Sequence, residues 1–159
     1  MNDLFGSMIT TEPVDDYSKP LADRLRPKSF KDICGQDHLT SEDGPFRAMC
    51  ANQILSSVIL WGPPGVGKTT LARLIPKTMR QVRFHEISAV SSGTADLKSI
   101  FKSAQETSSQ GKKFLLFVDE IHYFNKMQQD MFLPIIENGI LGLIGATSQN
   151  PSFQLNAAL

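Results

Sequence analysis

Eight residues with the sequence GPPGVGKT, at positions 62–69, constrain the fold of this chain more than any other stretch. They follow an apolar run, VILW at 58–61, and lead directly into TLARLI, which predicts a strand, a loop and a helix in that order. Glycines let the loop backbone wrap closely enough for successive N–H groups to point at phosphate oxygens, and the following helix adds the partial positive charge of its amino end. The spacing therefore predicts a phosphate-binding (Walker A) loop.

The side chains of this loop have distinct expected contacts with a nucleotide. Lys68 is predicted to reach the β- and γ-phosphates, and Thr69 to place its hydroxyl on Mg²⁺, which prefers hard oxygen ligands. A glycine-rich turn that matches the motif by chance is the alternative, and the flanking strand and helix disfavour it. The predicted nucleotide-binding residues of the loop are Gly62, Pro63, Pro64, Gly65, Val66, Gly67, Lys68, Thr69 and Thr70.

A second apolar run, FLLFV at 114–118, ends in two carboxylates. Asp119 stands where a Walker B aspartate holds magnesium, and Glu120 where a catalytic carboxylate orients and polarises an attacking water. Acidic groups at the carboxyl end of a central strand lie in the crevice where open α/β sheets bind ligands. The two motifs therefore predict one site for ATP and Mg²⁺, with Thr69 and Asp119 as metal ligands and Lys68 and Glu120 as catalytic residues.

Four short apolar runs are predicted to form strands, at residues 58–61, 84–88, 114–118 and 140–146. The first, third and fourth are apolar almost throughout, which is typical of parallel strands covered on both faces. Helical patterns lie between the runs. We therefore predict a three-layer α/β fold with a mostly parallel central sheet.

Two helical patterns accompany these strands. Residues 97–104 place apolar side chains at the spacing of one helix face, and residues 127–136 repeat Met, Phe and Ile in roughly the same way. We interpret the second stripe as core packing. Pro76 is expected to end or kink the helix that begins near Lys68, and Pro134 to disturb the later helix.

Composition limits the class of protein. With 159 residues, 16 basic and 16 acidic side chains and 41% hydrophobic residues, the chain has room for one folded domain and lacks the global charge of an autonomous nucleic-acid binder. No apolar run approaches the roughly 20 residues of a membrane span, and the first residues form no signal peptide, so we expect a soluble intracellular protein. The location that we expect is cytoplasmic, in bacteria and associated with the nucleoid rather than nuclear. Cys34 and Cys50 form no metal or redox motif, so we expect structural thiols in a reducing compartment.

The neutral net charge hides an uneven distribution. Residues 1–16 carry four acids and no base, so residues 1–18 are predicted to be a mobile tail and residues 19–159 the folded core. Residues 44–85 carry six bases and no acid, which suits a segment that meets anions. In the tail, NDLF at 2–5 is similar to the end of peptides that dock on sliding clamps, although an unpartnered terminus is the simpler interpretation.

Further polar groups leave alternatives open. In GATSQNP, at 145–151, Thr147 is suited to hydrogen-bond the γ-phosphate or the attacking water, or it belongs to a plain strand-to-turn exit. Residues 91–94 either face a central pore and touch DNA or simply begin a helix. The three histidines have no zinc-ligand spacing, and His122 completes a DEIH string that superficially resembles a DExH-box helicase.

Several segments together resemble one family. GPPGVGKTTLARLI, SAVSSGTADL, FVDEIHYFNKMQQDMFLP and LIGATSQNPSFQLNAAL, preceded by PLADRLRPKSFKDICGQDHL, are similar to replication-associated recombination protein A (RarA, also MgsA), an AAA+ ATPase family with the Werner helicase interacting protein as its eukaryotic relative. The resemblance runs from about residue 20 to residue 159. Its stretch at 119–134 favours this family over the Holliday-junction branch-migration motor and the clamp-loader subunits.

The resemblance implies an ATP hydrolase that assembles as a homo-oligomeric ring, with a tetramer expected. It also implies action with DNA and single-stranded-DNA-binding protein at stalled forks and gaps, in replication, recombination and repair. By the same resemblance, residues 25–35 wrap the adenine, with Arg26, Pro27 and Ile33 as contacts, and Thr147 takes the catalytic sensor-1 role. Gln149 replaces a Glu that the family tends to have, which puts a secondary polar contact in doubt.

Members of the family continue beyond the point where this sequence stops. They add a serine and an arginine that act in the neighbouring subunit, a fifth strand beside the first, a helical lid and an oligomerisation domain. The resemblance therefore implies a truncated core in which the strand at 58–61 is an unpaired apolar edge, so we expect marginal folding and hydrolysis impaired more than nucleotide binding. The alternatives are a non-catalytic nucleotide-binding module and a clamp-loader-like subunit.

Overall fold

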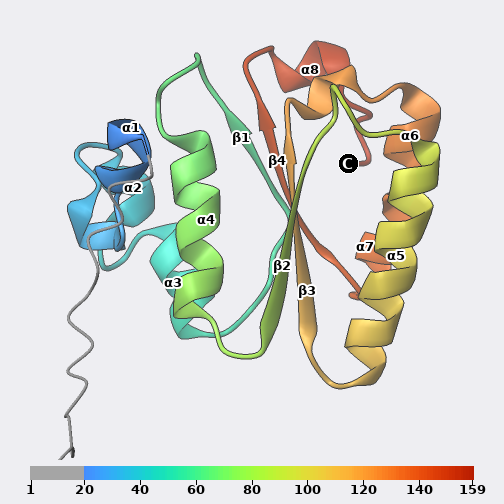
Figure 1. Cartoon of the computed structure of the whole chain (residues 1–159), viewed down its shortest axis with the longest axis horizontal. Coiled ribbons are helices and arrows are strands. Elements are labelled where there is room, and N and C mark those ends of the chain that lie inside the picture. The colour runs from blue at the N-terminus through green and yellow to red at the C-terminus, as the bar shows by residue number, and fades with distance from the viewer. Residues whose placement is uncertain (1–19) are drawn as a thin grey trace, which may run out of the picture.

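The computed structural model describes residues 20–159 and contains, within that range, a parallel sheet of four strands (Figure 1). The strands are β1 (Val58–Trp61), β2 (Val82–Ser88), β3 (Lys113–Asp119) and β4 (Gly142–Thr147), in the spatial order β1-β4-β3-β2. Every pairing between them is parallel, which confirms the predicted sheet. In the described residues β1 is an edge strand, as expected. The predicted tail and its NDLF segment lie outside the described residues.

Helices cover both faces of the sheet (Figure 1). On one face lie α4 (Lys68–Thr78) and α3 (Pro45–Ala51), with α1 (Leu21–Arg24), the 3-10 turn η1 (Phe30–Asp32) and α2 (Asp37–Thr40) beyond them. The other face carries α5 (Thr94–Ser109), α6 (Lys126–Asp130) and α7 (Leu133–Glu137). The 3-10 turn η2 (Ile121–Tyr123) and α8 (Pro151–Gln154) follow the carboxyl ends of β3 and β4. The three-layer prediction is therefore confirmed.

The core divides into two clusters on either side of β3. Leu115 and Phe117 join the cluster that contains Leu74 and Ile75 of α4, while Leu116 joins the cluster under α5. All five side chains are buried. Burial of a large apolar side chain contributes about 1.5–3 kcal/mol, so β3 and its neighbour β4, which is buried along its whole length, anchor the fold. Burial on both faces of the sheet therefore explains why the segments that form β3 and β4 are apolar almost throughout.

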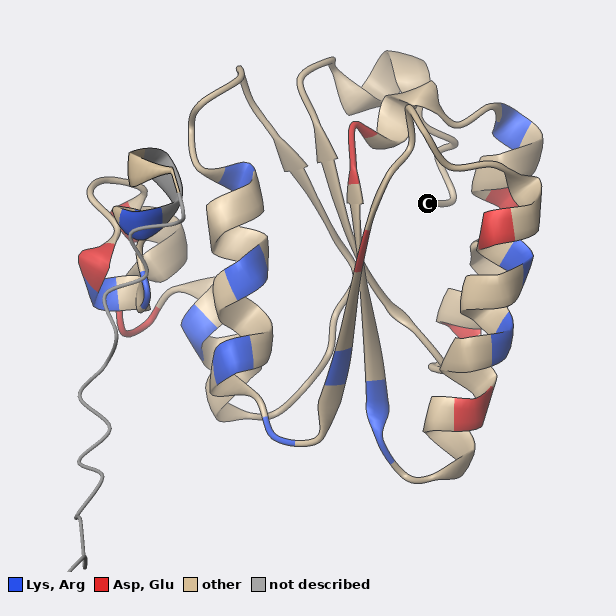
Figure 2. Cartoon of the chain, viewed as in Figure 1, with Lys and Arg blue, Asp and Glu red and all other residues tan. Residues whose placement is uncertain are grey.

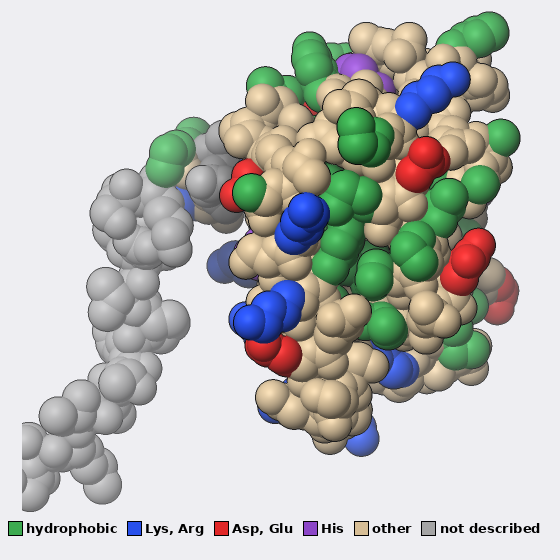
Figure 3. Space-filling model, turned by 90° about the vertical axis from the view of Figure 1, so that its right-hand side faces the viewer, with side chains coloured by type: hydrophobic (Ala, Val, Ile, Leu, Met, Phe, Trp, Pro, Cys, Tyr) green, Lys and Arg blue, Asp and Glu red, His purple; other side chains and the backbone are tan. Residues whose placement is uncertain are grey.

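The helix predictions need three adjustments. Pro76 does not end α4, which continues to Thr78. The stripe at 127–136 forms two short helices instead of one, with Pro134 in the first turn of α7, where its missing N–H costs least. The prediction that this stripe packs in the core was wrong for Met127, which is 71% exposed, and is confirmed for Phe132, which is fully buried. Hydrophobic side chains gather on the face of the molecule that carries α5, α6 and α7 (Figure 3).

No helix among residues 20–159 combines the length and the apolar character needed to cross a bilayer.

Candidate nucleotide-binding site

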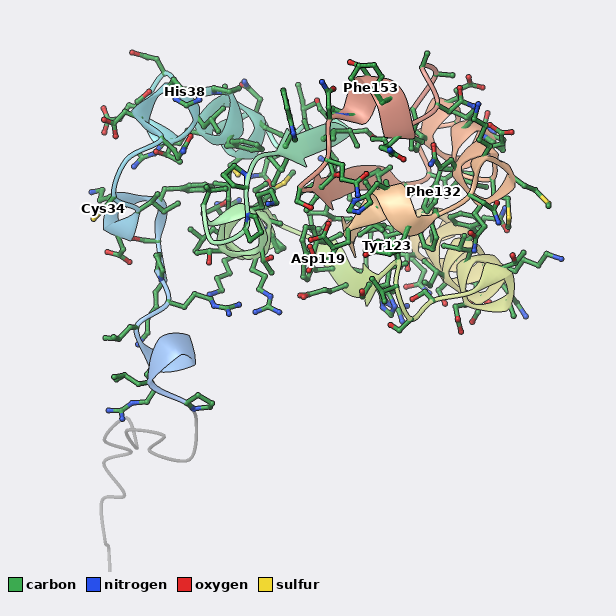
Figure 4. The ribbon with its side chains drawn as sticks, turned by 90° about the horizontal axis from the view of Figure 1, so that it is seen from above. Cys34, His38, Asp119, Tyr123, Phe132 and Phe153 are labelled. Carbon is green, nitrogen blue, oxygen red and sulfur yellow. The ribbon has the colours of Figure 1, made fainter. Side chains whose placement is uncertain are left out.

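The strand order brings the predicted motifs to one edge of the sheet. The carboxyl ends of all four strands meet there, and we call this the carboxyl edge. Because β4 lies between β1 and β3, Thr147 pairs in register with Trp61, and the N–H of Gly62 donates to the Thr147 carbonyl at 3.2 Å. Asp119 ends the next strand and lies in the middle of the molecule when seen from this edge (Figure 4). The glycine loop, the paired carboxylates and the threonine therefore share one site.

The loop at 62–67 has the backbone that its glycines predict. Gly65 and Gly67 have φ angles of +83° and +92°, a left-handed conformation that other residues adopt only with strain. Lys68 opens α4, and its Nζ donates to the carbonyls of Gly62 at 2.7 Å and Pro63 at 3.0 Å. The first turn of α4 contains no acid, so the positive end of the helix and the ammonium both act on the loop.

A cavity of about 720 Å³ lies beside the loop, between the amino-terminal segment and β1. Pro27 and Ile33, two of the predicted adenine contacts, line it together with the loop residues Gly65, Val66 and Lys68. Most of the remaining wall is apolar, which suits a planar base next to a polar phosphate site. Arg26 does not line this cavity but a second cleft, which Pro27, Thr70 and Arg73 also line, so Pro27 borders both hollows while Arg26 and Ile33 border different ones.

The two carboxylates at the end of β3 lie in different local geometries. Asp119 Oδ1 accepts the N–H of Glu120 at 3.2 Å. Glu120 has a φ angle of +50°, and a non-glycine residue in this left-handed conformation costs roughly 1–2 kcal/mol. The conformation turns the chain sharply into η2, and Glu120 Oε2 accepts the hydroxyl of Ser148 at 3.3 Å. Strain at a polar, partly buried site is typical of a functional position.

His122 is a member of this site that the sequence analysis missed. Its ring lies 2.9 Å from Thr147 Oγ1 and 3.2 Å from Glu120 Oε2, both measured from Nδ1, and its side chain is 6% exposed. Because the Thr147 hydroxyl donates to the Gln149 carbonyl, the hydrogen bond between Thr147 and the ring assigns the proton to Nδ1. The sequence signal was present, because the DEIH string places a histidine two residues after Glu120.

Thr147 lies fully buried at the end of β4. With Nδ1 of His122 as donor, the Thr147 hydroxyl donates to the Gln149 carbonyl at 3.2 Å and accepts the Gln149 N–H at 3.0 Å. The backbone of Gln149 makes these contacts, and its side chain is exposed. A Gln in place of Glu at this position therefore leaves the threonine network intact.

The donor set at the carboxyl edge fits a hard divalent cation. Thr69 has a hydroxyl in the first turn of α4, and Asp119 has a carboxylate at the end of β3, and both side chains are partly buried. Carboxylate and hydroxyl oxygens, completed by water and phosphate, are the ligands that Mg²⁺ takes in nucleotide sites. The residues present therefore fit the predicted metal.

A glycine loop between a parallel strand and a helix, two acids at the carboxyl end of β3 and a threonine on β4, which lies between the two, define a P-loop domain of the AAA+ ATPase class. Residues 25–157 match the sequence profile of the Holliday junction DNA helicase RuvB P-loop domain. The chain belongs to this family and, within it, to the replication-associated recombination protein A group, of which it represents the amino-terminal AAA+ part.

Individual relatives agree with this placement. The chain is 46% identical over 145 residues to replication-associated recombination protein A of Escherichia coli K12, which covers 91% of the chain and 32% of that protein. It is 46% identical over 140 residues to ATPase WRNIP1 of Dictyostelium discoideum, with 88% and 16% covered. The solved Thermotoga maritima RuvB Holliday junction branch migration motor matches with a TM-score of 0.68 and 31% identity, over 84% of this chain and 45% of that one. The chain thus spans about a third of the Escherichia coli relative.

Proposed function

We propose that the chain binds MgATP at the carboxyl edge and is the ATPase core of a DNA-maintenance protein. The observation that carries this proposal is the position of β4 between β1 and β3, which joins the glycine loop to the carboxylates through Thr147. A chance glycine turn would have no reason to meet two acids and a buried threonine.

Each residue of the site has a role in hydrolysis of the β–γ phosphate bond. The loop amides and Lys68 bind the phosphates and stabilise charge that develops on them. Thr69 and Asp119 would hold Mg²⁺, which neutralises phosphate charge when bound. Glu120 orients the attacking water for in-line attack, and Thr147 positions the γ-phosphate or that water. His122 aligns Glu120 with Thr147 through its two contacts.

The place of this activity in the cell follows from the relatives. Their names support a role in replication and recombination of DNA. We propose action in repair at stalled forks and single-strand gaps, assembly as a tetramer, and cooperation with single-stranded-DNA-binding protein. Because the chain covers about a third of the Escherichia coli relative, these are proposals for the longer protein.

Binding of a fluorescent ATP analogue tests the site. Lys68→Ala removes a charged contact with phosphate, worth about 1.5–3 kcal/mol, so affinity should fall roughly 10- to 150-fold. Lys98→Ala, on the exposed face of α5, is the matched control and should bind as the wild type does. Equal affinity of the two variants would contradict the loop assignment. ATP turnover with and without single-stranded DNA then separates an enzyme, which DNA should stimulate, from a silent nucleotide-binding module.

A further inference from the structure

The end of the sheet opposite the nucleotide loop carries a cluster of bases. Lys77, Arg80 and Arg83 lie in and around the turn between α4 and β2, and Lys112 and Lys113 in the turn before β3. We call this end, with its five bases, the amino edge. All five side chains are exposed, and the segments 77–83 and 110–113 contain no acid. Figure 2 shows blue at the lower ends of α4, β2 and β3.

Hydrogen bonds of backbone and side-chain groups join the turns of the amino edge into one surface. The N–H of Lys113 donates to the Gln81 carbonyl at 3.0 Å, and the N–H of Arg80 donates to Gln53 Oε1 at 2.7 Å. Lys113 Nζ donates to the Gln53 carbonyl. The bases from two turns are therefore held at defined positions next to each other.

Arg83 is the most firmly placed of the five bases. Its Cζ lies 5.9 Å from the centre of the Phe114 ring, and its Nη1 donates to Thr107 Oγ1 at 3.5 Å. Between Arg83 and Lys112 the surface is hollowed by about 380 Å³, and Gln81 and Gln110 also line the hollow. Guanidinium, ammonium and amide groups around a hollow form a donor set for phosphate oxygens.

The acids nearest the amino edge are fewer than its five bases, and they include Glu137, which ends α7 before the turn into β4. Glu86 on β2 is held by Arg73 in a bidentate pair, at 2.6 and 2.8 Å, and so does not neutralise the turn. Glu106 lies on α5, one helical turn before Gln110. The bases of the segment 44–85 are thus divided, with Lys68 at the carboxyl edge and three others at the amino edge.

We propose that the amino edge binds the phosphate backbone of nucleic acid. The choice of DNA as the partner rests on the proposed function. The surface itself is separate from the nucleotide site. In the described part of the chain, the large exposed aromatic side chains are Trp61, which ends β1, and Tyr123 and Phe153, which follow the carboxyl ends of β3 and β4. The amino edge offers charges and amides without a stacking surface, so binding there is independent of base sequence and strongly dependent on salt.

The test is fluorescence anisotropy of a labelled single-stranded oligonucleotide with the full chain over a series of salt concentrations. The double variant Arg80→Glu with Lys112→Glu should lose affinity about tenfold or more, and the slope of log K against log salt should fall by about 1.4. The control variant Lys98→Glu with Lys102→Glu makes the same change of charge on the exposed face of α5 and should bind as the wild type does. Arg80→Gln with Lys112→Gln should show a smaller loss.

Three results would overturn the inference: equal affinity of the amino-edge and α5 variants, no DNA binding by the wild type at low salt, or equal competition by polyglutamate at matched charge. Binding of the ATP analogue, measured on the same samples, keeps the two proposals distinct. Retained nucleotide affinity with unchanged DNA affinity would contradict only the amino edge. Retained affinity for the ATP analogue also shows that a variant is folded.

Discussion

The carboxyl and amino edges of one sheet hold their polar groups in opposite ways. At the carboxyl edge the His122 ring contacts both Thr147 Oγ1 and Glu120 Oε2, and Thr147 is fully buried. At the amino edge the side chains of Lys77, at the end of α4, and of Arg80 and Lys112, in the turns that follow α4 and precede β3, are exposed. The difference matches two kinds of chemistry, because catalysis needs groups held in fixed geometry, whereas binding of a polyanion needs only a field of hydrated charges.

Gln129 extends the contrast on the carboxyl side. It is 1% exposed, its Nε2 donates to the carbonyls of Phe124 at 2.8 Å and Gln154 at 3.1 Å, and its Oε1 accepts the N–H of Asn156 at 2.7 Å. One buried amide therefore connects the segment after β3 with the segment after β4. At the amino edge the comparable amide is Gln53, whose Oε1 accepts the N–H of Arg80 in a contact that is exposed.

The largest expected effect on stability is that of Gln129→Leu. The change leaves three backbone groups without this partner, and each buried unsatisfied group costs about 1–3 kcal/mol, so we expect a loss of about 2–4 kcal/mol after relaxation. The midpoint of thermal unfolding should fall by roughly 5–15 °C. Gln105→Leu, on the exposed side of α5, is the control and should change stability by less than about 0.5 kcal/mol. Similar midpoints of thermal unfolding for the two variants would contradict a stabilising role of the Gln129 hydrogen bonds at the carboxyl edge.

His122→Ala should have an intermediate effect. It breaks the link between Glu120 and Thr147, while Thr147 keeps both contacts with Gln149, so we expect a loss of about 1–2 kcal/mol in the free energy of unfolding by urea. His38→Ala removes an exposed imidazole on α2 and should be close to neutral. If the two histidine variants unfold alike, His122 does not hold the carboxylate.

The smallest effect concerns Cys50, which packs under α4. Burial raises the pKa of the Cys50 thiol, and the hydroxyl of Thr78, at 2.9 Å from Sγ, partly opposes the rise by lowering that pKa. The unfolded thiol therefore ionises first, so this contribution to stability is present below about pH 9 and is lost as the pH rises through the folded pKa. Urea unfolding at about pH 8 and about pH 10 should show a larger alkaline loss for the wild type than for Cys50→Ala. Cys34→Ala should follow the wild type, and equal losses in all three would contradict the assignment.

Local patterns predicted most of the fold and half of the site. The four apolar runs became strands, with β2 starting two residues earlier than expected and β4 two residues later. The glycine loop and the DE pair were predictable because each depends on residues next to one another in the sequence. The contacts of His122 with Thr147 and of Gln129 with Gln154 were not, since these partners lie 25 residues away and depend on the insertion of β4 between β1 and β3.

By itself, the sequence determined that this chain forms a glycine loop between a strand and a helix, two acids at the end of a buried strand and alternating strands and helices. These features follow from hydrophobic period, glycine conformation and spacing along the chain. Only the tertiary structure decided which groups meet: Thr147 with Gly62 and His122 at one edge, and Arg83 with Lys112 at the other. Strand order is a property of packing across the whole sheet, because a strand finds its neighbours by burying both faces and not by its place in the sequence.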